Sequence, residues 1–484
     1  MTSTVERPAQ TWRTVVGVLV CVELASGLLQ GYYTPIFTDI ARHLGMHDAD
    51  VNWFEAAQLI VSALLVPPLA KLGDLIGHRR ILLIATAATA VGSWALVVAP
   101  GFSSFLVGWA IQGAYVVWLP LEIAIVHRRT SGDALRTRKG AGVLVGFLYV
   151  AIIVGAGLSG ALVDAVPMAA VLAIPAVAVT LVLGVVWWGV EGAPGTATGA
   201  FDRAGLGWLT VVLALVMGGL VMVRVQGTGS LAGWVLVLLG LVALVPFWRV
   251  EAARREPLVD VRLLATPRQW PLQAVSALLG MSVLGAQIPL STFARTDPAV
   301  TGYGLGAGAG FVSVLIAVYV LAMAASAFGL PVTTRRLGAH GALVAACVLI
   351  AIGYAAWLPF HAHTWQGLLN MALVGLGTGT LVAALPAEAA AAAPPDRTGF
   401  ATGMTNATKT VGGAVASAIF AIALSATGSI ADPDPDKGVH PPFHGYLVVW
   451  SVCAAAAAVG ALLLALGGRP RRGSPGPNRR STDE

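Results

Sequence analysis

The segment Ala70-Lys-Leu-Gly-Asp-Leu-Ile-Gly-His-Arg-Arg80 is a short charged stretch between two long apolar runs, residues 51–70 and 80–100. Each run has the ~20 residues that a helix needs to cross the hydrocarbon core of a bilayer. Because backbone polar groups cannot be left unpaired in lipid, each run must be helical. The segment is therefore predicted to be a tight connection between two membrane-spanning helices.

The same alternation of apolar runs and short polar connections continues along the chain. Fourteen runs are long enough to cross a membrane. They cover residues 13–38, 51–70, 80–100, 103–126, 140–163, 167–189, 206–225, 231–249, 269–292, 308–332, 339–359, 364–387, 399–426 and 443–466. The sequence therefore predicts an all-α integral membrane protein of about fourteen transmembrane helices.

The composition supports a lipid environment. Of the 484 residues, 57% are hydrophobic and only 11% are charged, whereas soluble domains carry roughly 25% charged residues. The net charge of +6 is spread over short clusters between the apolar runs and forms no basic face, so we expect no nucleic-acid partner. The three cysteines lie inside apolar runs without metal-ligand spacing, which predicts small apolar packing residues.

The distribution of Lys and Arg predicts the orientation. If the N-terminus is cytoplasmic, the cytoplasmic segments hold 24 of the 29 basic residues, and Lys409 lies within a span. Positive charge gathers on the cytoplasmic side of membrane proteins. We therefore expect both termini in the cytoplasm and a multi-pass protein of the cell membrane. The outer loops hold only Arg42, Arg224, Arg295 and Lys437.

The first-quoted segment resembles a loop signature of the major facilitator superfamily. Asp74, Gly77 and Arg79 match its acid, glycine and base, and Ala70 replaces its first glycine. The resemblance implies a loop that holds the two halves of a transporter together in one conformation; the alternative is an ordinary cytoplasmic cluster of positive charge. The predicted gating residues are Gly73, Asp74, Gly77, Arg79 and Arg80.

Three further stretches, Trp53–Gln58, Glu256–Leu264 and Gly399–Gly413, resemble the fourteen-span drug:proton antiporter family of that superfamily. The resemblance implies two pseudo-symmetric six-helix bundles with two inserted helices between them. Leu337-Gly338 occupies the position of Ile76-Gly77 in the second half. The expected divisions are an N-terminal bundle at 1–192, an inserted pair at 193–256, a C-terminal bundle at 257–468 and a disordered basic tail at 469–484.

The chain also departs from the family. Trp109 stands where the family carries an Arg linked to proton coupling, just before Gln112-Gly113. In the fifth-span motif Ala156 replaces a proline, although a glycine stripe for helix packing remains at Gly155, Gly157 and Gly160. Ser26 occupies the position of the usual first-span Asp.

Glu23 lies about ten residues into the first span, roughly 15 Å deep at 1.5 Å per residue. A charge at that depth is costly, which makes this acid a candidate for function, here as the proton carrier. Gln30 and Tyr33 follow on its face at helical spacing and are predicted to line a water-filled cavity. The alternative is a neutral, hydrogen-bonded structural acid.

Two other acids and one base complete the predicted site. Glu122 shares a face with Tyr115 and Trp118, with Gln112 beside them, a surface that suits an amphiphilic or cationic ligand or, alternatively, anchors the helix at the headgroups. Glu55 is either an outer-gate acid or a solvated helix start. Lys409, on one face with Asn406, could bind an anionic group, counter a carboxylate or extend to the inner surface.

These features predict a secondary transporter that exports small hydrophobic or amphiphilic compounds in exchange for protons, as a monomer. No Walker loop, nucleophile elbow or metalloprotease motif occurs in the sequence, so we expect neither an ATP-driven pump nor an enzyme, and no cofactor or metal. Because two antiporter-linked motifs are altered, an uptake symporter or uniporter remains an alternative. A receptor or assembly protein on the same fold is another.

Overall fold

The computed structural model describes residues 12–129, 134–192, 202–227, 229–254, 257–394, 397–425 and 440–467, and every regular element in them is helical. The long helices of the first half are α1 (Trp12–Tyr32), α3 (Val51–Ile76), α4 (His78–Val97), α5 (Phe102–Gln112), α6 (Trp118–Arg129), α7 (Ala134–Leu162) and α8 (Met168–Gly189). Those that follow are α9 (Arg203–Gln226), α10 (Leu231–Ala253), α12 (Trp270–Gly280), α13 (Gln287–Arg295), α15 (Ala309–Ala356), α16 (Thr364–Ala391), α17 (Thr398–Leu424) and α18 (Phe443–Gly467). Short elements are η1 (Thr34–Ile36), α2 (Phe37–His43), η2 (Asp48–Asp50), η3 (Gly113–Val117), α11 (Val261–Leu264), η4 (Met281–Gly285) and α14 (Pro298–Thr301).

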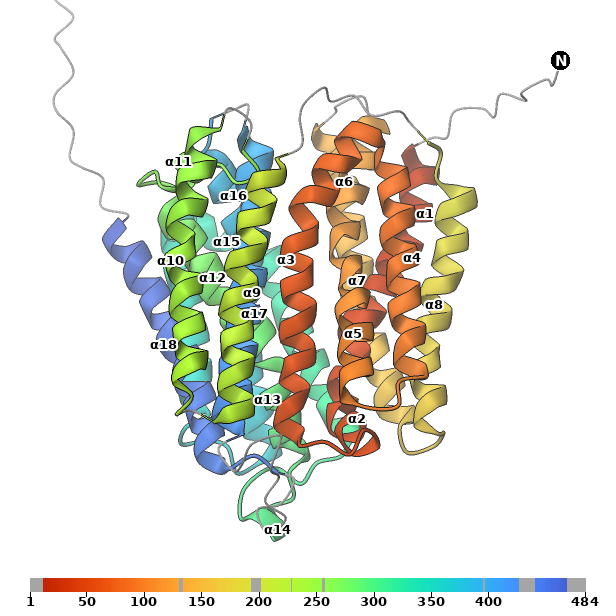
Figure 1. The fold of residues 1–484 in the computed structure, drawn as a ribbon, viewed down its shortest axis with the longest axis vertical. Helices are drawn as coiled ribbons and strands as arrows, with labels where there is room; N and C mark the ends of the chain where they lie inside the picture. The colour runs from red at the N-terminus through yellow and green to blue at the C-terminus, as the bar shows by residue number, and fades with distance from the viewer. Residues whose placement is uncertain are drawn as a thin grey trace, which may run out of the picture.

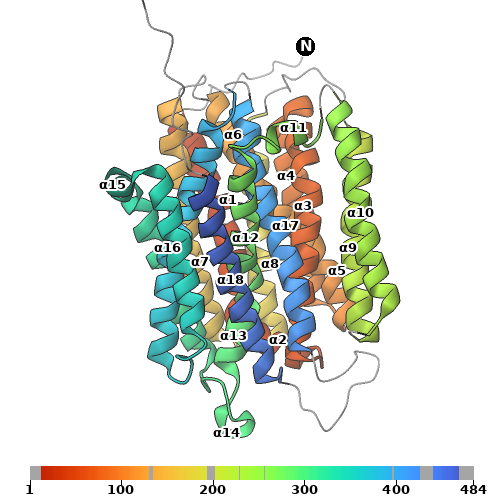
Figure 2. The same ribbon diagram turned by 90° about the vertical axis from the view of Figure 1, so that its left-hand side faces the viewer.

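The predicted number of spans is confirmed once α15 is divided. Thirteen stretches of the described chain are long and apolar enough to cross a membrane, and α15 is one of them, with 48 residues. A straight helix of that length would measure about 72 Å, more than twice the ~30 Å hydrocarbon core. Gly338 has φ 73° and ψ 163° inside α15, so two helices meet there at a sharp turn. They supply the tenth and eleventh of fourteen spans, and they pack beside α16 (Figure 2).

The turn at Gly338 has a counterpart in the first half. Gly77, with φ 103°, joins α3 directly to α4. A left-handed backbone is strained for residues with a Cβ, so glycine allows two helices to meet without a loop. The alignment of Ile76-Gly77 with Leu337-Gly338 thus corresponds to the same backbone feature in both halves.

The helices form two groups, each around its own apolar core (Figure 1). Residues between α1 and α8 build most of the first core, and residues from α11 to α18 build most of the second; Ile288 of α13 joins the first core and Ala49 of η2 the second. The α9–α10 pair packs on the side of both groups, where Met217 and Leu220 contact Trp53 of α3 and Ala418 of α17. The exact boundaries of the two bundles and of the inserted pair stay predictions.

The closest helix crossing of the first group depends on small residues. Gly27 and Gly31 of α1 lie against backbone atoms of Leu148 and Ile152 of α7, and an added Cβ at either glycine would collide with a carbonyl oxygen. The spacing Gly-x-x-x-Gly is typical of membrane helices that pack at short distance. This crossing fixes the face of α1 that carries Glu23.

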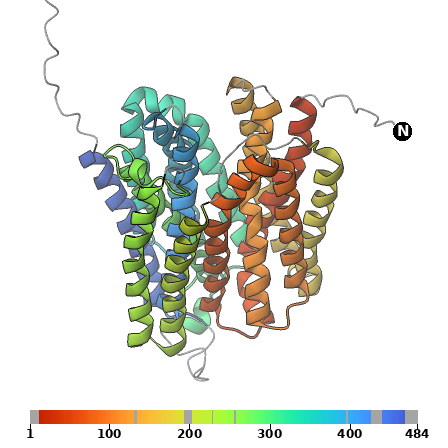
Figure 3. The same ribbon diagram turned by 45° about the horizontal axis from the view of Figure 1, so that its top comes forward.

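The start of α1 and the end of α18 lie at the same end of the bundle, which we name the terminal end (Figures 1 and 3). The helices α2 and α14 lie at the opposite end, which we name the far end. An even number of spans requires this arrangement. Which end faces the cytoplasm stays a prediction.

Candidate functional site

Glu23 of α1 and Glu122 of α6 form a buried carboxyl pair. Both residues have 0% exposed surface, and their side chains are near enough to each other to interact electrostatically. None of their four carboxyl oxygens has a hydrogen-bond partner in the part of the chain that the structure describes. Two neighbouring carboxylates in a buried position repel each other when both are ionised, so a proton on one of them would stabilise the pair.

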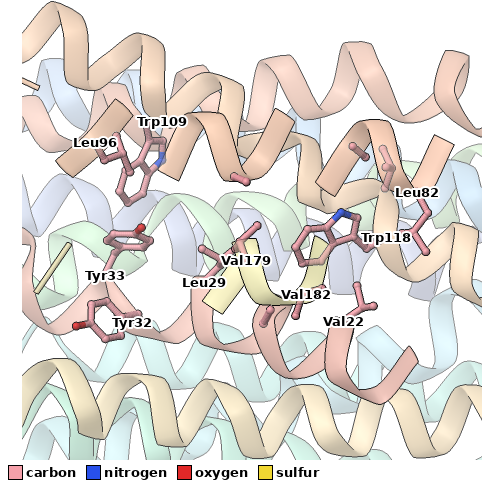
Figure 4. Close-up of a cluster of buried hydrophobic side chains, with 14 of the residues drawn as sticks. Val22, Leu29, Tyr32, Tyr33, Leu82, Leu96, Trp109, Trp118, Val179 and Val182 are labelled. Atoms are coloured by element: carbon pink, nitrogen blue, oxygen red, sulfur yellow. The ribbon is translucent and has the colours of Figure 1, made fainter. Parts of the chain in front are cut away.

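The surroundings of the pair are apolar. Val22 and Trp118, the neighbours of the two acids along α1 and α6, are buried in the core of the first group together with Leu82 and Val182 (Figure 4). Glu23 lies about 16 Å along α1 from Trp12, and Glu122 about 10 Å along α6 from Arg129. The pair therefore lies between the bilayer centre and the terminal end.

Gln112 is the centre of a second buried polar group, nearer the far end. Its Nε2 donates to the hydroxyl oxygens of Tyr33 and Ser93, both at 2.9 Å. Its Oε1 accepts from Gln58 Nε2 at 3.5 Å, and the ring of Tyr33 stands edge-on to that of Trp109 at 4.5 Å (Figure 4). The group joins α1, α3, α4 and α5.

These contacts cover part of the predicted cavity surface in this conformation. Gln112, Tyr33 and Trp118 are at most 3% exposed, so in this conformation they are packing residues between helices. Trp109, which replaces the family's Arg, is likewise buried, against Phe54 and Phe105. Helical spacing identifies a polar face and does not show whether another helix covers it, so the assignment of these residues to a substrate cavity stays a prediction.

The remaining predicted cavity residues keep accessible surface. Gln30 is exposed, and Tyr115, Asn406 and Lys409 are partly exposed. Within the described chain Lys409 forms no ion pair, and its backbone oxygen packs against Gly280 of α12. Their assignment to a substrate cavity stays a prediction.

Glu55 lies apart from the Glu23–Glu122 pair. It is partly buried on α3 and near enough to Tyr115 for the two side chains to interact electrostatically. Its predicted role at an outer gate is therefore separate from the carboxyl pair and stays a prediction.

Polar contacts join the two halves near the far end. Arg295 Nη2 of α13 lies 2.6 Å from Asp39 Oδ1 of α2, and Ser291 Oγ donates to the carbonyl oxygen of Thr34 at 2.5 Å. A further polar contact joins His440 Nδ1 to Asp48 Oδ2 at 3.2 Å. We name these contacts between the two halves the far-end gate. Thr34 and Asp39 follow α1 in the same span, so the far-end gate is connected through α1 to Glu23.

The sequence pattern of the Major Facilitator Superfamily matches residues 19–417. The chain belongs to this superfamily. The resemblance noted in the sequence is thereby confirmed, and the protein is a membrane transporter rather than an enzyme.

The similar proteins in this superfamily differ in their substrates. The chain is 24% identical to the tetracenomycin C resistance and export protein of Streptomyces glaucescens, over 80% of this chain and 71% of that protein. It is 26% identical to the uridine/deoxyuridine transporter of Lactococcus lactis, over 67% and 70%. The crystal structure of an auto-inhibited POT family peptide transporter superposes with a TM-score of 0.66 at 17% identity, over 98% of this chain and 99% of that one, which shows a shared fold.

In this superfamily member, the loop of the predicted gate contacts its own half. Arg79 Nη2 donates to the carbonyl oxygen of Trp187, near the end of α8, at 2.6 Å, and Arg80 is exposed. Gly73 lies against Leu121. The side chain of Asp74 is outside the described residues, so its predicted role is untested.

The predicted glycine stripe of α7 is only partly a packing surface. Gly155 lies against the backbone of Leu28 in α1, and Gly160 against Ala309 of α15, whereas an added Cβ at Gly157 would meet no atom within 4 Å. Gly157 points to a different side of α7 from Gly155, because residues two positions apart on a helix do not share a face.

The pairing of Glu23 with Glu122 was not anticipated from the sequence. Each acid was identified by its cost inside a membrane, but nothing in the spacing along the chain indicates that α1 and α6 cross at these residues. No group of three or more His, Cys, Asp or Glu residues that could hold a metal occurs in the described segments.

Proposed function

We propose that this transporter exports small hydrophobic or amphiphilic compounds across the cell membrane in exchange for protons. The observation that carries the proposal is the buried Glu23–Glu122 pair. Two carboxyl groups in contact in an apolar environment cannot both be ionised, and such a pair holds one proton between them. Loading and release of protons at this pair changes the charge of the bundle interior.

A change in charge at the pair acts on the far-end gate through α1. A pair that holds two protons is neutral and tolerates burial; a pair that has lost a proton is stabilised by water or by a cationic substrate group. Because α1 leads directly into η1 and α2, displacement of Glu23 moves Thr34 and Asp39 relative to α13. Alternating access would couple proton and substrate movement in this way.

Export is tested by expression in an efflux-deficient bacterial host challenged with ethidium, tetracenomycin C and uridine. Expression of the wild-type chain is expected to lower accumulation of ethidium or tetracenomycin C. Equal accumulation of all three compounds with and without the chain would argue against transport of these classes. Increased accumulation of uridine alone would indicate that the chain takes up its substrate and does not export it.

Nucleoside uptake is the second candidate function. The similarity to the uridine/deoxyuridine transporter favours it, as does Trp109 in place of the coupling Arg of the antiporter family. In that case the same carboxyl pair would bind a proton that enters together with the substrate.

A further inference from the structure

A separate cavity lies in the second half, at the terminal end. It has a volume of about 310 Å³, which is at the lower limit of small-ligand pockets. Its walls come from the start of α12, the second helix of α15, the end of α16 and the end of α18. Charged or titratable lining residues are Arg268, His340 and Glu388, and the apolar walls include Leu272, Leu343 and Leu464.

The cavity sits at the depth where the spans end. α12 begins at Trp270, α16 ends at Ala391 and α18 ends at Gly467, so its mouth is at the level of the lipid headgroups rather than in the hydrocarbon core. Trp270 and Leu466 beside it are 45% and 67% exposed. An aromatic ring and an exposed leucine at this level are typical of a surface in contact with lipid.

The basic and acidic side chains that line the cavity do not pair with one another. Arg268 and His340 form no ion pair with Glu388 among the described residues, although all three line the same space. Arg268 precedes the first turn of α12 and His340 follows the turn at Gly338, so the positive ends of two helices add to their side. Glu388 lies in the last turn of α16, whose free carbonyl groups make that side negative.

We propose that this cavity binds the headgroup of a phospholipid that carries both a phosphate and a primary amine, as phosphatidylethanolamine does. The phosphate is placed at Arg268 and His340, since guanidinium and the positive ends of helices both bind phosphate oxygens. The ammonium group is placed at Glu388. The leucine side chains accommodate the glycerol and the first methylene groups.

The proposal is tested by native mass spectrometry of the full chain, purified from nanodiscs with equal amounts of phosphatidylethanolamine and phosphatidylcholine. The wild-type protein should retain the ethanolamine lipid preferentially. Arg268→Gln should lower retention of both lipids by about fivefold, as expected for one lost charge-assisted contact. Glu388→Gln should keep lipid binding and lose the preference between the two headgroups.

Arg336→Gln is the matched control, because Arg336 is exposed at the same end but does not line the cavity. It should leave lipid retention unchanged, and thermal unfolding should show that all variants are folded. Equal retention in Arg268→Gln and Arg336→Gln would overturn the proposal. So would displacement of the lipid by soluble glycerophosphoethanolamine at the same concentration, because the cavity would then be a site for a soluble compound.

Discussion

Gln112 illustrates how single polar residues hold the helices of this protein together. Its amide bonds the hydroxyl groups of Tyr33 and Ser93 and accepts from Gln58, all in fully covered positions. Inside a membrane such groups have no water to replace a lost partner. The residue is therefore structural in the present conformation, although its residue type and face suggested substrate contact.

Gln112→Leu is expected to destabilise the folded protein. The hydroxyl groups of Tyr33 and Ser93 would lose a buried partner, at a cost of about 1–3 kcal/mol. Thermal unfolding in detergent should show a lower midpoint. Gln30→Leu is the control, because Gln30 is exposed and bonds only Ser26 at 3.1 Å in the described chain; an equal loss of stability in both variants would contradict the structural role.

Residue types alone predicted the candidates but not their contacts. The cost of charge in lipid identified Glu23, Glu122 and Lys409 correctly as residues within spans. Their pairing depends on where helices cross, and the crossing of α1 and α7 is set by the close approach at Gly27 and Gly31. The sequence contains those glycines but does not specify which helix they meet.

Among the elements, the span formed by α1, η1 and α2 connects the carboxyl pair to the far-end gate. It carries Glu23 near one end and Asp39 near the other. The Asp39–Arg295 ion pair is mostly covered, with 13% and 9% of the side chains exposed. Opening of the far end requires separation of these two charges.

Arg295→Gln is expected to favour the conformation open at the far end. An ion pair contributes about 1 kcal/mol even when partly exposed, which corresponds to about a fivefold change in the ratio of open to closed states. The test uses a chain whose own cysteines are replaced and that carries Ser291→Cys. The rate at which a membrane-impermeant maleimide labels this cysteine should be about fivefold higher with Arg295→Gln than without it. Arg42→Gln, which removes a more exposed partner of Asp39 at 3.7 Å, should have little effect; unchanged labelling in Arg295→Gln would show that the pair does not restrain the gate.

The turn at Gly338 gives a second prediction for an element. Gly338→Ala should lower the free energy of unfolding by about 1–3 kcal/mol through backbone strain, because φ 73° and ψ 163° form a conformation that residues with a Cβ rarely adopt. An added Cβ would meet no atom within 4 Å, so no steric clash adds to this strain. Gly329→Ala in the same element also meets no atom but has an ordinary helical backbone, so it should be neutral or stabilising. Denaturation midpoints of the two variants compare these effects directly.

For the molecule as a whole, the length and spacing of the apolar runs predicted the helical spans, and the motif resemblance implied the two bundles. Apolar runs of span length, separated by charged segments, can only form membrane-spanning helices in a bilayer. The two runs predicted on either side of Gly338 form one continuous element, α15, because the chain turns at that glycine without a loop. The interruptions at η3 and η4 were less predictable. Pro120 explains the first in retrospect, since it cannot donate a backbone hydrogen bond into the preceding turn at Val116.

The orientation of the molecule can be tested with reporter fusions. The 24-to-4 division of positive charge predicts cytoplasmic termini. A reporter after Glu484 should be active on the cytoplasmic side, and one within residues 432–436 on the outer side. Activity of both on one side would contradict the orientation and the number of spans.

The most direct test of the central claim is uphill transport by reconstituted protein. Wild-type protein and Glu23→Gln are placed in proteoliposomes with an internal pH indicator and a preformed proton gradient, with ethidium or tetracenomycin C as selected by the host assay. Wild-type protein should concentrate the compound and dissipate the gradient. Glu23→Gln keeps the size of the side chain but cannot lose a proton, so it should exchange equal substrate pools and fail to concentrate the compound; normal accumulation by Glu23→Gln would contradict proton coupling through the Glu23–Glu122 pair.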